Sequence, residues 1–146
     1  DKIIKEYDMN LLDLECQLFD IPELEYTVDI ILESHIFKDY INELIKFGDD
    51  LNFLCNENEI VLSSEGDEGK SKIIINEEYL EEYAIEEEAN VELSFAIRIV
   101  KIVSNFVKLN KLTNIHISED KPLKIEYNLD DYGNKLSFFL APKITD

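Results

Sequence analysis

The stretch VELSFAIRIVKIVSNFVK (residues 91–108) changes its hydrophobic period once, and this change decides the fold. Val91, Leu93 and Phe95 alternate along the chain, as residues of a half-buried strand do. From residue 96 to about residue 108 the apolar residues recur at helical spacing, which predicts a helix. A strand that runs directly into a helix is therefore the unit to look for in the rest of the chain.

The first half of the chain repeats this unit. Residues 26–32 alternate like a strand, residues 33–47 place apolar side chains at helical spacing, and Gly48 fits the position just past a helix end. Three short strand-like segments follow each predicted helix: 51–55, 60–63 and 71–75, then 113–117, 123–127 and 136–140. Two strand–helix–three-strand units predict an α+β domain with antiparallel sheets and both helices on one face.

Composition and net charge restrict the type of protein and the kind of binding partner. The chain has 146 residues, of which 45% are hydrophobic, as expected for one globular domain, and its two cysteines are too few for a disulfide framework. Its 14 basic and 33 acidic residues give a net charge of −19, which argues against direct binding of nucleic acid. Residues 93–118, however, contain no acid, so the basic residues there form a local exception.

The second predicted helix carries a basic stripe. At 100° per residue, Arg98, Lys101 and Lys108 fall on one arc, and the opposite arc holds apolar residues that we expect to be packed. The apolar residues are Phe95, Ile99, Ile102, Val103, Phe106 and Val107. The first helix repeats the stripe weakly with Lys38 and Lys46. The alternative is the ordinary polar face of any amphipathic helix.

Bulky apolar residues also occur where a core does not obviously need them. In LDLECQLFDIPELEY (residues 12–26), Phe19 and Ile21 flank Pro22 in an acidic segment, and the proline favours an extended chain. Exposed apolar residues on an extended connector indicate a docking surface for another protein. The alternative is that these residues close the core.

Four segments carry a family resemblance: QLFDIPELEY (17–26), FAIR (95–98), KPLKIEY (121–127) and FLAPKI (139–144). With them the chain resembles the proliferating cell nuclear antigen (PCNA) family of DNA sliding clamps. The resemblance implies a DNA-clamp domain whose helices line a central hole and face double-stranded DNA without reading its sequence. Arg98 matches the family's FALR-like run, and Lys101, Lys108, Lys38 and Lys46 follow as DNA-facing candidates by helix geometry.

The resemblance also implies a pocket that receives a short aromatic-bearing helix from DNA polymerase and other replication and repair proteins. The matching positions are Phe19, Ile21, Pro22, Glu23, Tyr26, Pro122, Phe139, Ala141, Pro142, Lys143 and Ile144. Family members further imply a clamp loader, a homotrimeric ring and a nuclear location. Asp20 and Leu24 depart from the family pattern, and Glu57 stands where many clamps have a lysine that accepts ubiquitin.

The family match also predicts the domain boundaries. Residues 1–12 correspond to the last strand of a preceding domain, residues 13–25 to the interdomain connector and residues 26–146 to the C-terminal clamp domain. The resemblance further implies a ring in which second domains pair edge to edge with a neighbour's first domain. We expect the edges to be residues 5–12 and 71–75.

Enzyme signals are weak. Gly69, Lys70 and Ser71 imitate the end of a phosphate loop, but Asp67 and Glu68 would repel phosphate. His35 and His116 are isolated and are expected on the surface, so we predict no metal, no cofactor and no catalytic residue. The leading hypothesis is a processivity clamp and docking platform. The first alternative is a clamp-like adaptor, such as a checkpoint or viral relative, that binds proteins without encircling DNA. The second, more distant alternative is an acidic hydrolase that uses a pair of carboxylates.

Overall fold

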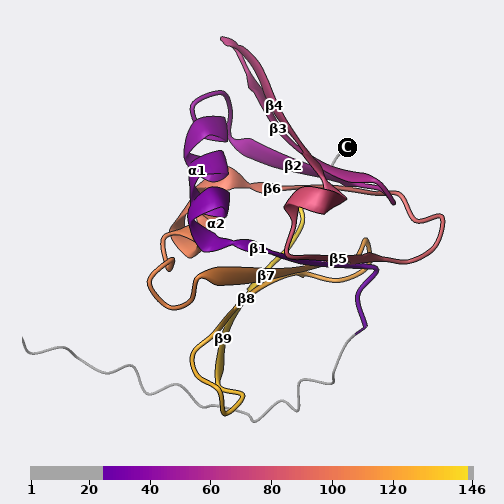
Figure 1. Ribbon diagram of the computed structural model, residues 1–146. Coiled ribbons are helices and arrows are strands. Elements are labelled where there is room, and N and C mark those ends of the chain that lie inside the picture. The colour runs from indigo at the N-terminus through magenta and orange to yellow at the C-terminus, as the bar shows by residue number, and fades with distance from the viewer. Residues whose placement is uncertain (1–24, 145–146) are drawn as a thin grey trace, which may run out of the picture.

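The computed structural model describes residues 25–144, which form two antiparallel sheets and two helices (Figure 1). The five-stranded sheet has the order β5-β1-β7-β8-β9, and the four-stranded sheet has the order β4-β3-β2-β6. The helices are α1 (Ser34–Leu44) and α2 (Ile97–Ser104), and a 3-10 turn, η1, covers Glu77–Tyr79. The strands are β1 (Val28–Glu33), β2 (Asp50–Cys55), β3 (Glu59–Gly66), β4 (Gly69–Asn76), β5 (Glu82–Ile85), β6 (Val91–Ala96), β7 (Leu112–Ile117), β8 (Leu123–Asn128) and β9 (Lys135–Leu140).

The predicted duplication is confirmed. The first repeat is β1-α1-β2-β3-β4, and the second is β6-α2-β7-β8-β9. Each repeat contributes strands to both sheets. Strand β1 of the first repeat lies in the same sheet as β7, β8 and β9, and β6 of the second repeat lies in the same sheet as β2, β3 and β4. The α+β class with antiparallel sheets is therefore correct, and the two helices lie together on one side of the sheets (Figure 1).

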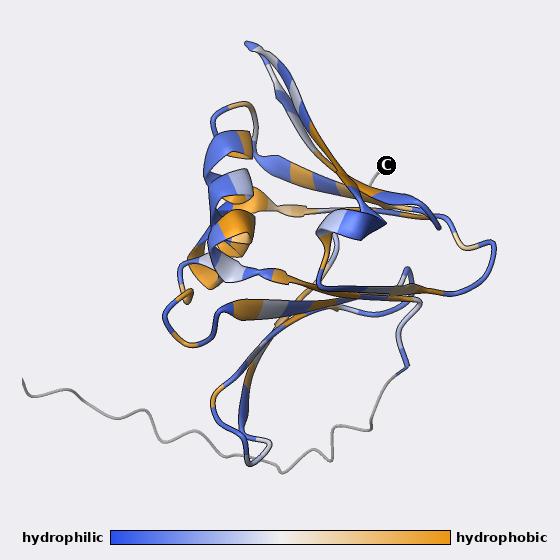
Figure 2. Ribbon diagram, viewed as in Figure 1, coloured by the Kyte–Doolittle hydropathy of each residue, from blue (hydrophilic) through white to orange (hydrophobic). Residues whose placement is uncertain are grey.

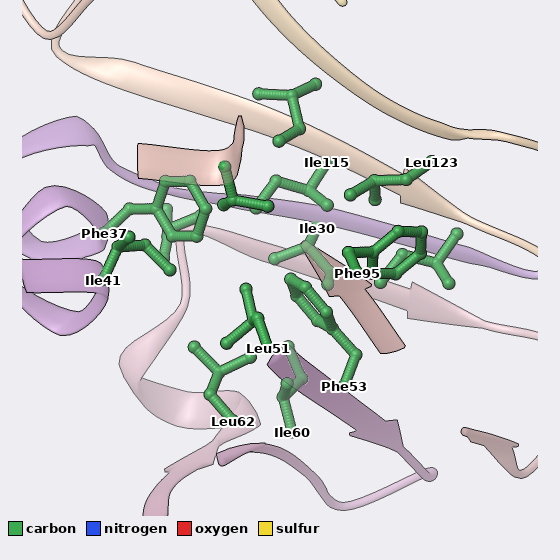
Figure 3. Close-up of a cluster of buried hydrophobic side chains, with 14 of the residues drawn as sticks. Ile30, Phe37, Ile41, Leu51, Phe53, Ile60, Leu62, Phe95, Ile115 and Leu123 are labelled. Carbon is green, nitrogen blue, oxygen red and sulfur yellow. The ribbon is translucent and has the colours of Figure 1, made fainter. Parts of the chain in front are cut away.

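The hydrophobic core lies between the two sheets (Figure 3). Strand alternation builds it, because every second side chain points inward: Val28 and Ile30 on β1 and Leu51 and Phe53 on β2 are almost fully buried. The rings of Phe53 and Phe95 meet edge to face with centroids 5.8 Å apart across the β2–β6 pair.

Both helices pack against this core and against each other. On α1 the buried residues are Ser34, Phe37, Ile41 and Leu44, which repeat at helical spacing as predicted. On α2 they are Ile97, Val100, Val103 and Ser104. Helix α2 is shorter than the predicted segment 96–108, because it ends at Ser104.

The two helices are fixed differently at their ends. After α1, a Cβ atom on Gly48 would overlap the carbonyl oxygen of Glu65 at the end of β3, and one on Gly66 would overlap the carbonyl oxygen of Phe47. Glycine is therefore required at both positions. Near the end of α2, the hydroxyl of buried Tyr127 on β8 donates a hydrogen bond of 2.8 Å to the carbonyl oxygen of Val103.

One strand differs from the expectation. Residues 77–89 read as an acidic link between the halves, but Glu82–Ile85 forms β5, which pairs with β1 at an edge of the five-stranded sheet. Tyr83 explains the strand, because its ring packs on the core and its hydroxyl donates to the carbonyl of Asn56, 2.5 Å away. Within residues 25–144 no helix is long and apolar enough to cross a membrane.

Candidate functional site

The solvent-facing side of α2 carries both basic and apolar side chains. Arg98 is exposed and Lys101 is half-buried, and neither makes an ion pair with another residue that the structure describes. Ile99 and Ile102, which we expected to be packed, are 44% and 58% exposed. The predicted packed arc was wrong by about a quarter turn, because five of the eight residues of α2 are apolar and leave the helical phase ambiguous.

The other DNA-facing candidates do not continue this surface. Lys108 is exposed but lies beyond the end of α2, so its predicted place on the helical stripe was wrong. Lys38 is half-buried on α1, and Lys46 is exposed just past the end of α1. Figure 2 shows α1 as largely hydrophilic and α2 as largely hydrophobic. The structure thus brings Arg98 and Lys101 together on one helix, with Lys38 on the neighbouring helix and Lys46 just past its end.

The first docking candidate that the structure describes is Tyr26, just before β1. Its ring lies 5.5 Å from that of His116, and the ammonium group of Lys121 lies 5.6 Å from the ring centre. Lys121 also donates a hydrogen bond to the carbonyl oxygen of Glu25. Burial, with the charges of Glu126 and Asp29, raises the pKa of Tyr26, so its hydroxyl stays protonated at neutral pH.

His116 contacts Asp29 directly. The two residues are partners in the β1–β7 register, and the Nδ1 of His116 lies 2.5 Å from a carboxylate oxygen of Asp29. Together with Tyr26 they line an open cleft of about 390 Å³, which Glu25, Glu86 and Lys124 complete. His116 is therefore not the isolated surface residue that the sequence predicted.

Lys124 joins this cleft to the next docking candidate, Phe139. The two residues are partners in the β8–β9 register, and the ammonium group lies 6.0 Å from the ring centre. Phe139 is 44% exposed. Tyr26 and Phe139 therefore lie on the same solvent-facing side of the five-stranded sheet, as partners of one docking surface would.

Glu126 fixes the position of Lys124. This carboxylate is almost fully buried and lies 3.1 Å from the ammonium group of Lys124 and 3.3 Å from that of Lys135. Ser137 donates a further hydrogen bond of 2.8 Å to it. Burial acts to raise the pKa of Glu126, but the hydrogen bonds from Ser137 and Lys124 and the charge of Lys124 lower it on balance.

The tail, residues 141–144, leaves β9 and reaches the other sheet. The backbone N–H of Lys143 donates a hydrogen bond of 2.7 Å to the carbonyl oxygen of Ser94 on β6. The side chain of Lys143 makes an ion pair with Asp50, at the start of β2. Ala141 is exposed, Pro142 is half-buried and Ile144 is 92% exposed.

The remaining docking candidates are placed as follows. Pro122 is exposed in the loop between β7 and β8. Phe19, Ile21, Pro22 and Glu23, and the predicted strand within residues 1–12, lie outside the described residues. Sequence reasoning missed Asp29, Lys121, Lys124 and Asp50. Strand alternation gives a partial signal, since it puts Asp29 on the face opposite Val28 and Ile30.

Comparisons with known proteins identify the family of the chain. A family model described as the C-terminal domain of proliferating cell nuclear antigen matches residues 20–143. The chain belongs to the PCNA family. It is 29% identical to "Proliferating cell nuclear antigen 2" of Drosophila melanogaster, over 97% of this chain and 55% of that protein. It is 32% identical to "Proliferating cell nuclear antigen" of Chaetomium thermophilum, over 98% of this chain and 57% of that protein.

The chain therefore spans a little over half the length of these PCNA relatives. The PCNA family is one of sliding clamps, which act as scaffolds and not as enzymes. Within residues 25–144 no group of three or more histidine, cysteine and acidic side chains is placed to hold a metal ion. Burial raises the pKa of the Cys55 thiol to about 12, so this core cysteine is a poor nucleophile at neutral pH.

Proposed function

We propose that this chain is part of a sliding clamp subunit that encircles double-stranded DNA, acts as a processivity factor and catalyses no reaction. The observation that carries the proposal is the solvent face of α2, where Arg98 and Lys101 stand beside each other in a chain with a net charge of −19. A ring stays on DNA by topology and not by affinity. Its lining then needs only enough positive charge not to repel phosphate.

The complete subunit would act in the nucleus as a homotrimer placed on DNA by a clamp loader. The position of β4 supports the assembly into a ring, because β4 lies at an edge of the four-stranded sheet with Ile74 56% exposed. Exposed edge strands readily accept another strand. The partner edge expected at residues 5–12 lies outside the described residues.

Topological binding can be tested with circular DNA. The full-length protein, loaded onto a nicked circle, should remain bound at a salt concentration that screens ionic contacts, and should leave when the circle is cut. Loss that does not depend on cutting the circle would contradict encirclement. Charge reversal by Arg98→Glu with Lys101→Glu should shorten retention.

We also propose that the docking surface, defined by Tyr26, Phe139 and the tail, binds short peptides of DNA polymerase and other replication and repair proteins. Exposed Phe139 and Ile144 support this, because aromatic and aliphatic residues in the centre of an interface usually carry most of the binding energy. A synthetic helical peptide with two aromatic anchors should bind in a titration. Binding should be lost in Pro142→Asp and in Ile21→Asp, whose position in the connector comes from the family match.

One observation favours a second function, a clamp-like adaptor that binds proteins without encircling DNA. The exposed residues of α1 include Asp39 and Glu43, and those of α2 include Ile99 and Ile102, which were predicted to be packed, so acidic and apolar side chains share the helical surface with the basic ones. A full-length protein that binds the peptide but is never retained on circular DNA would establish the adaptor in place of the clamp.

A further inference from the structure

The tail bridges the two sheets at one residue. β9, an edge of the five-stranded sheet, ends at Leu140, and three residues later the backbone of Lys143 bonds to Ser94 on β6, an edge of the four-stranded sheet. This hydrogen bond sets where along β6 the tail lies. It does not set the direction of the tail side chains, because the chain can rotate about a single hydrogen bond.

A second contact removes this freedom. The ammonium group of Lys143 pairs with the carboxylate of Asp50, the first residue of β2. Asp50 is the register partner of Ala96 and lies on the solvent face of the sheet, since its neighbour Leu51 is fully buried. Lys143 is therefore held by its backbone on one strand and by its side chain on the next.

We propose that Asp50 is a positioning residue of the docking surface, which acts through Lys143 to orient Pro142 and Ile144. In an extended chain, successive side chains point to opposite sides. Holding the Lys143 side chain over the sheet turns Ile144 away from the sheet, and Ile144 is 92% exposed, whereas Pro142 is half-buried. The proposal rests on the proposed function, in which these tail residues contact the docked peptide.

The surroundings single out Asp50 among the nearby acids. Lys143 lines a cleft of about 300 Å³ together with Asn52, Glu92, Leu93 and Ser94. The carboxylate of Glu92 accepts a hydrogen bond of 3.4 Å from Asn52 and pairs with no lysine or arginine among the described residues. Asp49, next to Asp50 in the chain, is exposed, and its side chain pairs with no described residue, so it offers a matched control.

The test compares Asp50→Asn, Asp50→Glu and Asp49→Asn in the full-length protein. The first measurement is the hydrogen exchange of the Lys143 amide, and the second is the affinity for the synthetic two-aromatic peptide. In Asp50→Asn the amide should exchange about two- to fivefold faster and the peptide should bind about two- to fivefold more weakly, as for loss of one exposed ion pair. Asp50→Glu should restore both values, and Asp49→Asn should change neither.

The salt dependence of peptide binding distinguishes an electrostatic role of Asp50 from a general structural role. At about 1 M salt the wild type and Asp50→Asn should bind the peptide equally, because an exposed ion pair is screened there. Unchanged exchange of the Lys143 amide in Asp50→Asn would overturn the proposal. Faster exchange with unchanged affinity would overturn the role in docking. A wild type that binds no peptide would refute the proposed docking function itself, and the exchange data would still show whether Asp50 holds the tail.

Discussion

The two repeats use the same order of elements but hold their helices with different chemistry. In the first repeat the end of α1 rests on β3 by contact of backbone with backbone, at Gly48 and Gly66. In the second, a side chain of the corresponding strand β8 reaches the end of α2, through the hydroxyl of Tyr127. A duplicated fold thus requires that each helix end be held by the same strand, but it does not require the same residues.

The repeats also differ in charge. The exposed residues of α1 include Asp39 and Glu43, whereas α2 carries no acid. On β3 the buried residues Val61 and Ser63 are neutral, whereas β8 buries the charged Glu126. The second repeat therefore concentrates both the cationic helix and the buried ion-pair network.

The largest effect should come from Gly48→Ala in the first repeat. The added methyl group overlaps the backbone of Glu65, which can move only if β3 moves, so we expect a loss of about 3 kcal/mol in the free energy of unfolding. Asn105→Ala, just past the end of α2, is the matched change in the second repeat. It should cost less than about 0.5 kcal/mol. Chemical denaturation of both variants measures the difference, and equal losses would show that the two helix ends are held alike.

A smaller, pH-dependent effect should mark the second repeat. Glu126→Gln removes a buried carboxylate that pairs with Lys124 and Lys135, which should cost about 1–2 kcal/mol at pH 7. Since the pKa of Glu126 is lowered in the folded protein, this contribution is complete above the unfolded pKa of about 4.3. It disappears as the pH falls through the lower folded value.

Denaturation curves at pH 7 and near pH 3 test this prediction, with the exposed Glu119→Gln as the control that should have no effect at either pH. A Glu126→Gln cost that stays constant between the two pH values would show that the carboxylate charge is not what stabilises this face.

The smallest of these effects should come from Tyr127→Phe. The change removes the hydrogen bond to Val103 and leaves the ring in place, so we expect a loss of about 1 kcal/mol. Tyr132→Phe, at a tyrosine that is 92% exposed, should change nothing measurable. Faster hydrogen exchange confined to the end of α2 would show that this hydroxyl holds the helix. Unchanged exchange there would mean that packing alone does so.

Within residues 25–144, the repeat order, eight of the nine strands and both helices could be predicted from hydrophobic period and turn residues. β5 was missed because it is only four residues long and lies between acidic segments, and its strand character comes from packing of Tyr83. The end of α2 was misplaced for a similar reason. Phe106 lies 5.2 Å from the ring of Phe138 and 6.5 Å from that of Tyr127, and these tertiary contacts override the helical pattern.

The candidate site was less predictable than the fold. Helical period indicated Arg98 and Lys101 as neighbours, and the family resemblance marked Tyr26 and Phe139. The pairs of Asp29 with His116 and of Asp50 with Lys143 join residues 87 and 93 positions apart. Such pairs depend on strand register and on the path of the tail, which a single sequence does not specify.

The most direct test of the central claim compares the two helices in the full-length protein loaded on circular DNA. Arg98→Glu with Lys101→Glu on α2 and Lys38→Glu with Lys46→Glu on and after α1 change the net charge equally. We predict that the α2 pair shortens retention by about tenfold or more at moderate salt, and the α1 pair by clearly less. Equal loss from both pairs, or none from the α2 pair, would contradict the claim that the solvent face of α2 faces DNA.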